Sequence, residues 1–362
     1  MVKIAVIGAG VIGMTCAVKI KEAYKDIDVV LISSEFSPNT TGDGSGGLWY
    51  PYLCGSTPHQ LLQKWGGQTY KFLIEQWKAG GYGVCMLPIY NFYRTKEKFC
   101  KPEWAHTVIG YHVLDSKELE DYNNLFSGKY TAGQTFTTFV SSPPTLLAYF
   151  LKRFKQANGK VQQAKLTSLN DPLLHQYDVV VNCTGMGARF LVSDDRVEPI
   201  RGQIVKVKAP WINQSVIDEE GGNYIIPKTY RFPHDVFLHR FESSGEEMNY
   251  TNAETVVLGG TRQKDFSTEI DPKDTDFILN GCKKMMPGLE HAEIVSHWAG
   301  LRPSRDAIRL EPEEKNGKLF IHNYGHGGSG FTLFWGCGEE VLQILQTYLN
   351  KNQKLYYRNS KL

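Results

Sequence analysis

The hydrophobic pattern at the start of the chain predicts a strand, a helix and a second strand. Residues 2–7 are apolar apart from Lys3, which is typical of a strand that is covered on both faces. Apolar residues then recur at helical spacing from Val11 to Tyr24, and residues 29–32 form a second apolar run. The three segments have the length of a β-α-β unit, so the chain opens as an α/β fold.

The later part of the chain repeats this pattern in separated pieces. An apolar stripe over 146–154 predicts a helix that begins at Pro143, and residues 178–185 predict a buried strand that ends in small residues. Further strands and a closing helix are expected over 204–208, 255–258 and 339–349. The glycine-rich residues 42–47 predict a flexible loop, while residues 50–140 are rich in aromatic and turn residues and give no clear pattern. We therefore expect a nucleotide fold of separated segments, interleaved with a second domain.

The bulk composition limits the functional class. Of the 362 residues, 41% are hydrophobic and 22% are charged, as in an ordinary globular protein. The formal net charge of +2 gives no indication of binding to nucleic acid or a membrane surface, and no apolar run approaches the length of a membrane span. Seven cysteines occur singly without metal-ligand spacing, so we predict reduced thiols and no metal site.

A glycine pattern between the first strand and the first helix predicts a dinucleotide site. Gly8 permits the tight turn, Gly10 lets the backbone approach a pyrophosphate, and Gly13 lets helix and strand pack closely. The start of the helix then faces the phosphates. At the end of the second strand, Glu35 is the candidate for binding the ribose hydroxyls.

The glycine pattern alone fits either a nicotinamide cofactor or FAD. The Thr- and Gly-rich segment that runs through Gly47 favours FAD, since extended FAD needs contacts beyond the first β-α-β unit. A strand that ends in Thr184-Gly185 is also frequent in FAD proteins. FAD is therefore the predicted cofactor.

Short motifs along nearly the whole chain resemble those of one family. They are Val6–Gly13, Gly47–Tyr52, Val181–Gly185, Arg201–Gln203, Ala209–Trp211, Tyr224–Pro227, Leu258–Gln263, Gly300–Pro303 and His322–Gly330. In content and in order they resemble the D-amino-acid oxidase family, which includes D-aspartate oxidases. The resemblance implies that a D-amino acid passes its α-hydrogen as hydride to FAD. A 2-oxo acid, ammonia and hydrogen peroxide result, with oxygen as the acceptor. Because the flavin carries the chemistry, no side chain is assigned as acid or base.

The resemblance also implies a domain organisation. A Rossmann-like FAD-binding domain is expected from segments 1–50, 141–195 and 296–350. An interleaved α+β substrate-binding domain with a mixed sheet is expected from 51–140 and 196–295, followed by a tail over 351–362. The oligomeric state is not indicated.

Site residues follow from the same resemblance. Arg302 and Tyr224 are expected to bind the substrate α-carboxylate, because a guanidinium meets a carboxylate with two parallel hydrogen bonds. The backbone of Gly328 or Ser329 is expected to accept from the substrate amine. The implied cofactor contacts are Gly8, Gly10, Val11, Ile12, Gly13, Ser34, Glu35, Thr40, Thr41, Gly47, Leu48, Leu166, Cys183, Thr184, Gly185, Gly327, Gly328, Gly330, Phe331 and Thr332.

Arg262 decides the expected substrate class. In Gly-Gly-Thr-Arg-Gln-Lys the chain resembles the D-aspartate oxidase branch, whose arginine meets a side-chain carboxylate. A buried unpaired arginine is costly, so acidic substrates, D-aspartate and D-glutamate, are favoured. The alternative is an oxidase of neutral D-amino acids, because the second arginine of the acidic branch is missing near Ile217. The long stretch 228–254 contains four further charged or titratable residues, Arg231, His234, His239 and Arg240. Three roles are open to them: to replace the missing charge, to cover the pocket, or to form a solvated hairpin, and we favour the hairpin.

Two other functions of a flavoprotein remain as alternatives, and the C-terminus indicates a cellular location. A glycine or N-methylamino-acid oxidase shares the flavin fold, and a non-enzymatic flavin-binding scaffold is a different class. Ser360-Lys361-Leu362 is the tripeptide that the peroxisomal import receptor reads, so the peroxisomal matrix is the expected location.

Overall fold

The computed structural model describes residues 2–80, 82–126, 128–229 and 254–358. Its strands are β1 (Lys3–Ile7), β2 (Asp28–Ser33), β3 (Val84–Tyr93), β4 (Ile109–Val113), β5 (Ala132–Ser141), β6 (Lys160–Gln163), β7 (Val179–Asn182), β8 (Glu198–Lys208), β9 (Ser215–Asp218), β10 (Tyr224–Thr229), β11 (Glu254–Gly259), β12 (Glu293–Lys315) and β13 (Lys318–His326). Its helices are α1 (Val11–Ala23), α2 (His59–Lys78), α3 (Ser116–Leu125), α4 (Pro143–Gln156), α5 (Ala188–Leu191), α7 (Pro272–Met285) and α8 (Gly330–Arg358).

Within the described residues, the strands form one mixed sheet. Their order is β4-β5-β3-β9-β10-β11-β8-β12-β13-β7-β1-β2-β6. The last five, from β13 to β6, pair in parallel, whereas β8, β10, β11 and β12 pair in antiparallel fashion. The predicted α/β fold with a mixed sheet is confirmed.

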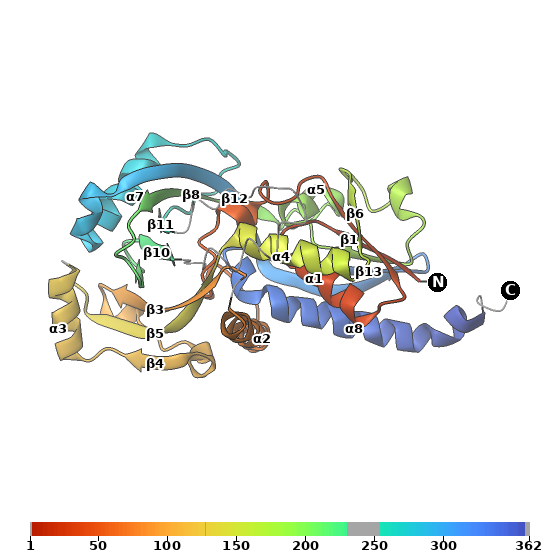
Figure 1. Cartoon of the computed structure of the whole chain (residues 1–362), viewed down its shortest axis with the longest axis horizontal. Coiled ribbons are helices and arrows are strands. Elements are labelled where there is room, and N and C mark those ends of the chain that lie inside the picture. The colour runs from red at the N-terminus through yellow and green to blue at the C-terminus, as the bar shows by residue number, and fades with distance from the viewer. Residues whose placement is uncertain (1, 81, 127, 230–253, 359–362) are drawn as a thin grey trace.

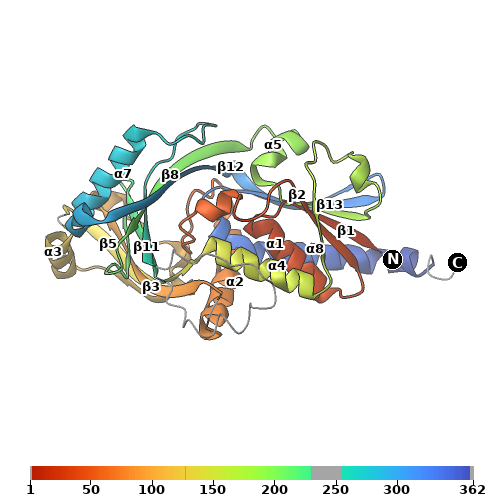
Figure 2. The same ribbon diagram turned by 45° about the horizontal axis from the view of Figure 1, so that its top comes forward.

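The parallel end of the sheet is covered on both faces, as the apolar run in β1 predicted. Ile4 and Val6 pack into the core beneath the helices, while Ala5 and Ile7 belong to a second cluster on the opposite face with Leu174. In Figures 1 and 2, α1, α4 and α8 lie together beside β1 and β13, and both chain ends are at this end of the molecule. The predicted strand-helix-strand opening is confirmed as β1, α1 and β2.

The other end of the molecule is built on antiparallel strands. The long strands β8 and β12 run between the two ends (Figure 2), and β4, β5, β3, β9, β10 and β11 complete the sheet there, with β3 and β9 as its one parallel pair among the described strands. Helix α7 packs on this end through Ile278 and Cys282, in the same cluster as Val256 and Leu258 of β11. Because the sheet is continuous through β8 and β12, the predicted domain boundaries stay a prediction.

Several local expectations change. Residues 50–140 contain β3, β4, β5, α2 and α3, although their pattern predicted no clear element. The closing helix starts at Gly330, well before the predicted residue 339. The glycine-rich loop is not an open flexible segment, because Thr41–Gly44 forms a 3-10 turn in which Asp43 accepts from the Thr40 N–H and hydroxyl.

Helix α2 contains two glycines that explain why the sequence pattern of residues 59–78 indicates no helix. Gly66 and Gly67 lie inside the helix, where glycine has low helix propensity. The helix packs closely on α8: the Thr69 hydroxyl accepts from the Gly336 N–H at 3.1 Å, and a Cβ on Gly336 would lie 2.2 Å from the Trp65 carbonyl oxygen. Tertiary packing on α8 therefore stabilises α2 as a helix despite its interior glycines. No described helix is long and apolar enough to cross a membrane.

Candidate active site

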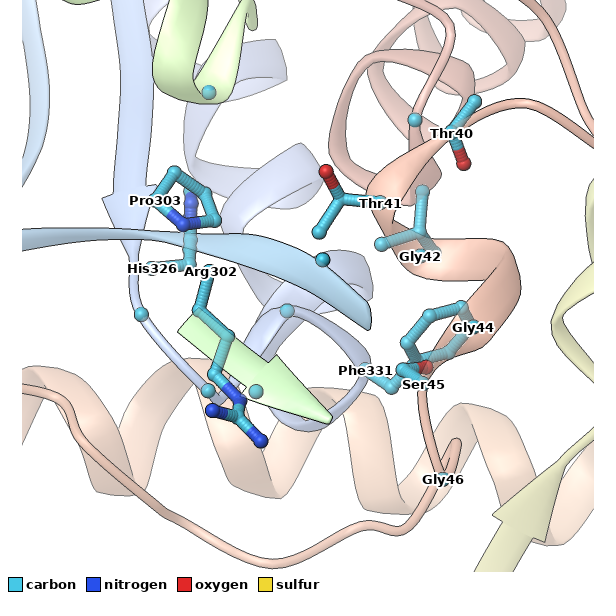
Figure 3. A pocket seen from close by; sticks show the side chains of 18 of the residues that line it. Thr40, Thr41, Gly42, Gly44, Ser45, Gly46, Arg302, Pro303, His326 and Phe331 are labelled. Atoms are coloured by element: carbon cyan, nitrogen blue, oxygen red, sulfur yellow. The ribbon is translucent and has the colours of Figure 1, made fainter. Parts of the chain in front are cut away.

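A cavity of about 470 Å³ opens where the two ends of the molecule meet. Small-molecule sites have volumes of this order. Its walls come from distant segments: the turn after β1, residues 40–48, the end of β7, strands β8 to β12 and the start of α8. Figure 3 shows residues 40–46 on one side and Arg302 with Pro303 on the other. The structure thus brings most of the predicted site residues to one cavity.

The glycine turn after β1 has three different local requirements. Gly8 has a φ of +102°, and a Cβ on Gly13 would lie 1.9 Å from the Gly8 carbonyl oxygen. A Cβ on Gly10 would meet no protein atom within 4 Å, although Gly10 lines the cavity with Val11 and Ile12. Gly8 and Gly13 therefore serve the protein's own packing, whereas Gly10 leaves space on the cavity side.

The neighbouring strand ends supply more of the wall. Ser34 and Glu35 follow β2 and are exposed on the cavity, and Cys183, Thr184 and Gly185 follow β7. Leu166 does not line the cavity, because its side chain packs at the edge of the cluster that holds Leu174. Its predicted cofactor contact has no support in this geometry.

The segment from Thr40 to Leu48 forms the opposite wall. Thr40 and Thr41 line the cavity, with the Thr40 hydroxyl donating to Asp43 at 2.7 Å. Gly47 has a φ of +64°, and its carbonyl accepts from the Ser141 N–H at 2.8 Å. Leu48 follows in a bridge to Val140, so β5 anchors the end of this segment.

The start of α8 meets the cavity through its backbone. Gly327, Gly328, Gly330 and Phe331 line the wall, so the positive ends of α1 and α8 both face this space. Ser329 and Thr332, predicted to contact substrate or cofactor, lie behind the wall. Their hydroxyls bond the backbone of residues 50–52: Ser329 pairs with Tyr52 at 2.7 and 2.8 Å, and Thr332 pairs with Tyr50 at 2.9 and 3.1 Å. They fix the adjoining loop.

Arg302 and Tyr224 face the substrate end of the cavity. The Arg302 guanidinium donates to the Thr261 carbonyl at 3.0 Å and forms no ion pair with another described residue. Burial raises the pKa of Tyr224 and the charge of Arg302 lowers it in part, so the hydroxyl keeps its proton near neutral pH. A charged planar donor and a hydroxyl donor beside it suit a carboxylate.

Glycines on neighbouring strands make room for both side chains. A Cβ on Gly202 of β8 would lie 2.3 Å from the Arg302 guanidinium. A Cβ on Gly259 of β11, which pairs with Tyr224, would lie 2.3 Å from the tyrosine hydroxyl oxygen. Gly202 and Gly259 belong to two of the family motifs. That they make room for Arg302 and Tyr224 follows only from the strand register.

Arg262 also lines the cavity, but it is exposed. The expectation of a buried arginine is wrong, because Arg262 follows β11 in irregular chain rather than inside the sheet. It forms no hydrogen bond or ion pair with any other described residue, although its charge acts on Glu219 in the same cavity and lowers the pKa of that carboxyl. The charged residues Arg231, His234, His239 and Arg240 lie outside the described residues.

Glu219 is a cavity residue that the sequence analysis missed. Its Oε1 accepts from the Tyr50 hydroxyl at 2.6 Å and from the Asn91 side chain at 3.2 Å. Burial raises the pKa of Glu219, and the Tyr50 hydrogen bond and the Arg262 charge lower it in part. No sequence pattern marked it, because β9 had to be placed beside β3 first.

Three residues of the cavity wall, Ser45, Asn323 and His326, carry buried polar atoms that have no hydrogen-bond partner among the described residues. These atoms are Ser45 Oγ, Asn323 Oδ1 and His326 Nε2. Burial lowers the pKa of His326 to about 3, so the imidazole is neutral. Leaving a buried polar atom unpaired costs about 1–3 kcal/mol. Together with the space beside Gly10, these atoms fit a large polar cofactor.

Comparison with known proteins decides which cofactor. The family model described as "FAD dependent oxidoreductase", DAO, matches residues 3–344. The chain belongs to the DAO family of FAD-dependent oxidoreductases. The predicted cofactor, FAD, is thereby confirmed.

Relatives of this oxidoreductase cover nearly its whole length. It is 37% identical over 360 residues to a D-amino acid oxidase of Dugesia ryukyuensis, with 96% of this chain and 98% of that protein covered. It is 31% identical over 352 residues to a human D-aspartate oxidase, with 95% and 94% covered. The comparisons therefore do not separate the two branches.

Solved structures confirm the fold of the oxidoreductase. A glycine oxidase of Geobacillus kaustophilus superposes with a TM-score of 0.74 at 16% identity, covering 96% of this chain and 95% of that one. A Mycoplasma pneumoniae L-alpha-glycerophosphate oxidase with FAD bound gives 0.71 at 15% identity, with 96% and 95% covered. At such identities the likeness concerns the fold alone.

Proposed function

We propose that this oxidoreductase deaminates D-amino acids oxidatively, forming a 2-oxo acid, ammonia and hydrogen peroxide with oxygen as the acceptor. The observation that carries the proposal is Arg302, which forms no ion pair among the described residues, beside the protonated Tyr224, in the same cavity as the glycine turn. Relatives named D-amino acid oxidase and D-aspartate oxidase, at 37% and 31% identity, support it. FAD, when bound, would supply the hydride-accepting chemistry and the reaction with oxygen.

The protein's own residues bind and orient the substrate. Arg302 donates two parallel hydrogen bonds to the α-carboxylate, and the Tyr224 hydroxyl adds a third donor. The backbone of Gly328, on the cavity wall, accepts from the substrate amine. These contacts fix two substituents of the α-carbon, the carboxylate and the amine, and a place for the side chain in the cavity is the third contact needed to select the D-form. The turn at Gly8–Ile12, residues 40–48 and the start of α8 line the cavity and would hold FAD.

We further propose that acidic D-amino acids are substrates through Arg262. The support is that its guanidinium lines the cavity and has no ion-pair partner among the described residues. A distal carboxylate would supply that partner. The alternative, a preference for neutral D-amino acids, is supported by the stretch 216–220, which lacks the second arginine of the acidic branch, and by the carboxylate of Glu219 in the same cavity.

A peroxide assay with D-aspartate, D-glutamate, D-alanine and their L-forms tests both points. We expect peroxide from D-forms only. Arg262→Leu should lower kcat/KM for D-aspartate about tenfold to a hundredfold more than for D-alanine, because one charge-assisted hydrogen bond is removed. Equal proportional losses on both substrates would give the lead to the neutral alternative. Peroxide from L-forms alone would overturn the proposed activity.

For location, we propose the peroxisomal matrix. The support is the tripeptide Ser360-Lys361-Leu362, a receptor-read address. Deleting these residues should leave kcat/KM unchanged and spread a fluorescently tagged protein through the cytosol. Continued peroxisomal import of the truncated protein would refute this address.

A further inference from the structure

The Arg302 guanidinium is held by backbone carbonyl groups rather than by a carboxylate. Arg302 extends from β12 toward the cavity (Figure 3), and its Nη1 donates to the Thr261 carbonyl at 3.0 Å and to the Arg201 carbonyl at 3.4 Å. It has no ion-pair partner among the described residues. Because a guanidinium binds a carboxylate through two parallel hydrogen bonds, its plane must be fixed as well as its charge. The residues that fix these two carbonyls therefore bear on ligand binding.

The two carbonyls are supported differently. Arg201 lies within β8, and its carbonyl also accepts from the Gln263 N–H at 3.1 Å. Thr261 lies beyond the end of β11, whose backbone pairing with β8 ends at Gly259 and Ile204. The carbonyl that makes the shorter bond to the guanidinium thus lies outside the strand pairing and needs another support.

The side chain of Thr261 supplies this support. Its hydroxyl accepts from the Gln203 N–H at 2.6 Å and donates to the Gln203 carbonyl at 3.4 Å. Both residues are buried. The hydroxyl thus bonds both backbone groups of one β8 residue, as a neighbouring strand would. Because a β-branched side chain is stiff at χ1, it holds its own backbone, and with it the carbonyl, against β8.

A second attachment holds the far side of the same segment. Gln263 pairs with Arg201 through two backbone hydrogen bonds, at 2.7 and 3.1 Å. The buried Arg201 guanidinium in turn forms an ion pair with Asp274 of α7. None of these contacts involves the Thr261 side chain. Loss of its hydroxyl should therefore shift the Thr261 carbonyl without releasing the whole segment 261–263 from β8.

We infer that Thr261 is a positioning residue for the α-carboxylate site: its hydroxyl fastens the chain to β8, and its carbonyl orients the Arg302 guanidinium. This inference rests on the proposed function, since it takes Arg302 as the group that binds the substrate carboxylate. Thr261 itself does not line the cavity. Because it acts through Arg302, it affects every substrate that has an α-carboxylate, whatever the side chain of that substrate.

An unreactive carboxylate tests this role without turnover. Hexanoate has the carboxylate of a substrate but no α-amine, and its dissociation constant is measured from the change in the absorbance of bound FAD. Thr261→Val keeps the shape of the side chain and removes the hydroxyl, so hexanoate should bind about threefold to tenfold more weakly, as for the loss of one hydrogen bond. Thr261→Ser keeps the hydroxyl and should bind hexanoate as the wild-type protein does.

An unchanged dissociation constant in Thr261→Val would overturn the inference. If this variant fails to fold, Thr261→Ala takes its place, because the smaller side chain leaves room for a water molecule beside the Gln203 N–H. The same weakening of hexanoate binding is expected of it, and wild-type binding would again overturn the inference.

Thr69 provides the matched control. Its buried hydroxyl also accepts from a backbone N–H, that of Gly336 at 3.1 Å, and donates to a carbonyl, that of Trp65 at 2.9 Å, but it joins α2 to α8. Thr69→Val should lower the melting temperature without changing the affinity for hexanoate. Equal weakening of hexanoate binding by both valine variants would assign the effect to a general loss of stability and overturn the inference.

A double variant shows whether Thr261 acts through Arg302. In an Arg302→Met background the Thr261 carbonyl has no guanidinium to orient, so Thr261→Val should weaken hexanoate no further. An equal loss of affinity in both backgrounds would show that Thr261 acts independently of Arg302, against the inference.

The kinetic arm uses D-aspartate and D-alanine, which has no distal group to meet Arg262. Thr261→Val should raise KM for both substrates by the same factor, about threefold to tenfold, with a smaller change in kcat. A loss confined to D-aspartate would place the effect on Arg262 and overturn the inference. Failure of the proposed function would look different: no D-amino acid would yield peroxide, even with the wild-type protein, while hexanoate binding would still report on Arg302 and Thr261.

Discussion

The two ends of the cavity are built from different parts of the polypeptide. At the cofactor end, backbone at strand ends and helix starts forms the wall, through Gly8–Ile12, Gly47 and Gly327–Gly330. At the substrate end, side chains from separate strands do so: Tyr224 on β10, Arg302 on β12 and Glu219 after β9. A wall made of backbone is determined by short stretches of the sequence. A wall made of side chains from several strands forms only when strands that are distant in the sequence pair with one another.

This difference also determines how each end responds to change. At Gly8, Gly10, Gly13 and Gly47 of the cofactor end, a new Cβ would meet either open space or backbone, so a substitution there should remove the cofactor or damage the fold. At Gly202 and Gly259 of the substrate end, a new Cβ would meet the side chain of Arg302 or Tyr224, so a substitution there should move a ligand-binding group and leave the fold intact.

The largest effect is expected at the glycine turn. Gly10→Val places its side chain in the cavity where no protein atom lies within 4 Å, so it should abolish FAD retention without changing the melting temperature of the apoprotein. The measurement is the flavin absorbance of the protein after gel filtration. Full FAD content in this variant would remove Gly10 from the cofactor site.

Gly13→Val is the matched comparison on the same turn. Its Cβ would lie 1.9 Å from the Gly8 carbonyl oxygen, so backbone must shift. We expect a lower apoprotein melting temperature in addition to loss of FAD, because overpacking typically costs about 1–3 kcal/mol. Equal apoprotein stability of the two variants would refute the division between packing and cavity-facing glycines.

At the substrate end, Gly202→Ala should displace the carboxylate clamp. The new Cβ would lie 2.3 Å from the Arg302 guanidinium, the movable end of a long side chain. KM for every D-amino acid should rise about tenfold or more, because misplacing one bidentate charged pair costs about 1.5–3 kcal/mol. FAD content should stay at the wild-type level.

Gly288→Ala controls for the loss of a glycine at that end of the molecule. Its nearest contact would be Trp211 Nε1 at 3.6 Å, an ordinary van der Waals distance. We expect wild-type KM and wild-type FAD content. If Gly202→Ala also leaves KM and FAD content at the wild-type level, the position of the Arg302 guanidinium does not depend on the missing side chain at Gly202.

A smaller effect is expected from pH. Burial raises the pKa of Glu219 above that of a free glutamate, and the negative charge of the nearby Asp218 raises it further. The hydrogen bond from Tyr50 and the charge of Arg262 lower this pKa in part. As pH falls through this raised value, Glu219 gains a proton and loses its charge. Hexanoate and 6-aminohexanoate are unreactive carboxylates that differ by a distal ammonium, which a charged Glu219 attracts. The ratio of their dissociation constants should therefore move toward 1 on acidification, while Glu219→Gln shows no such change. The same pH dependence in both proteins would assign it to another group.

The contrast between the two ends explains what the sequence could predict. Strand β1, helix α1 and strand β2 were predictable because their apolar spacing and glycine turn are local features. Helix α2 was not, because interior glycines mask a helix whose packing on α8 is tertiary. The family motifs identified Arg302 and Tyr224. Glu219 carries no local signal, since only the pairing of β3 with β9 brings Asn91 close to it.

The most direct test of the account is anaerobic mixing of the purified holoprotein with a D-amino acid. We predict that D-alanine abolishes the visible absorbance of bound FAD, that L-alanine does not, and that admitting oxygen restores the absorbance and yields hydrogen peroxide. The same treatment of Arg302→Ala should leave the absorbance largely unchanged at equal D-alanine concentration. If the wild-type protein retains its FAD absorbance with D-alanine, D-aspartate and D-lysine alike, the proposed activity is contradicted.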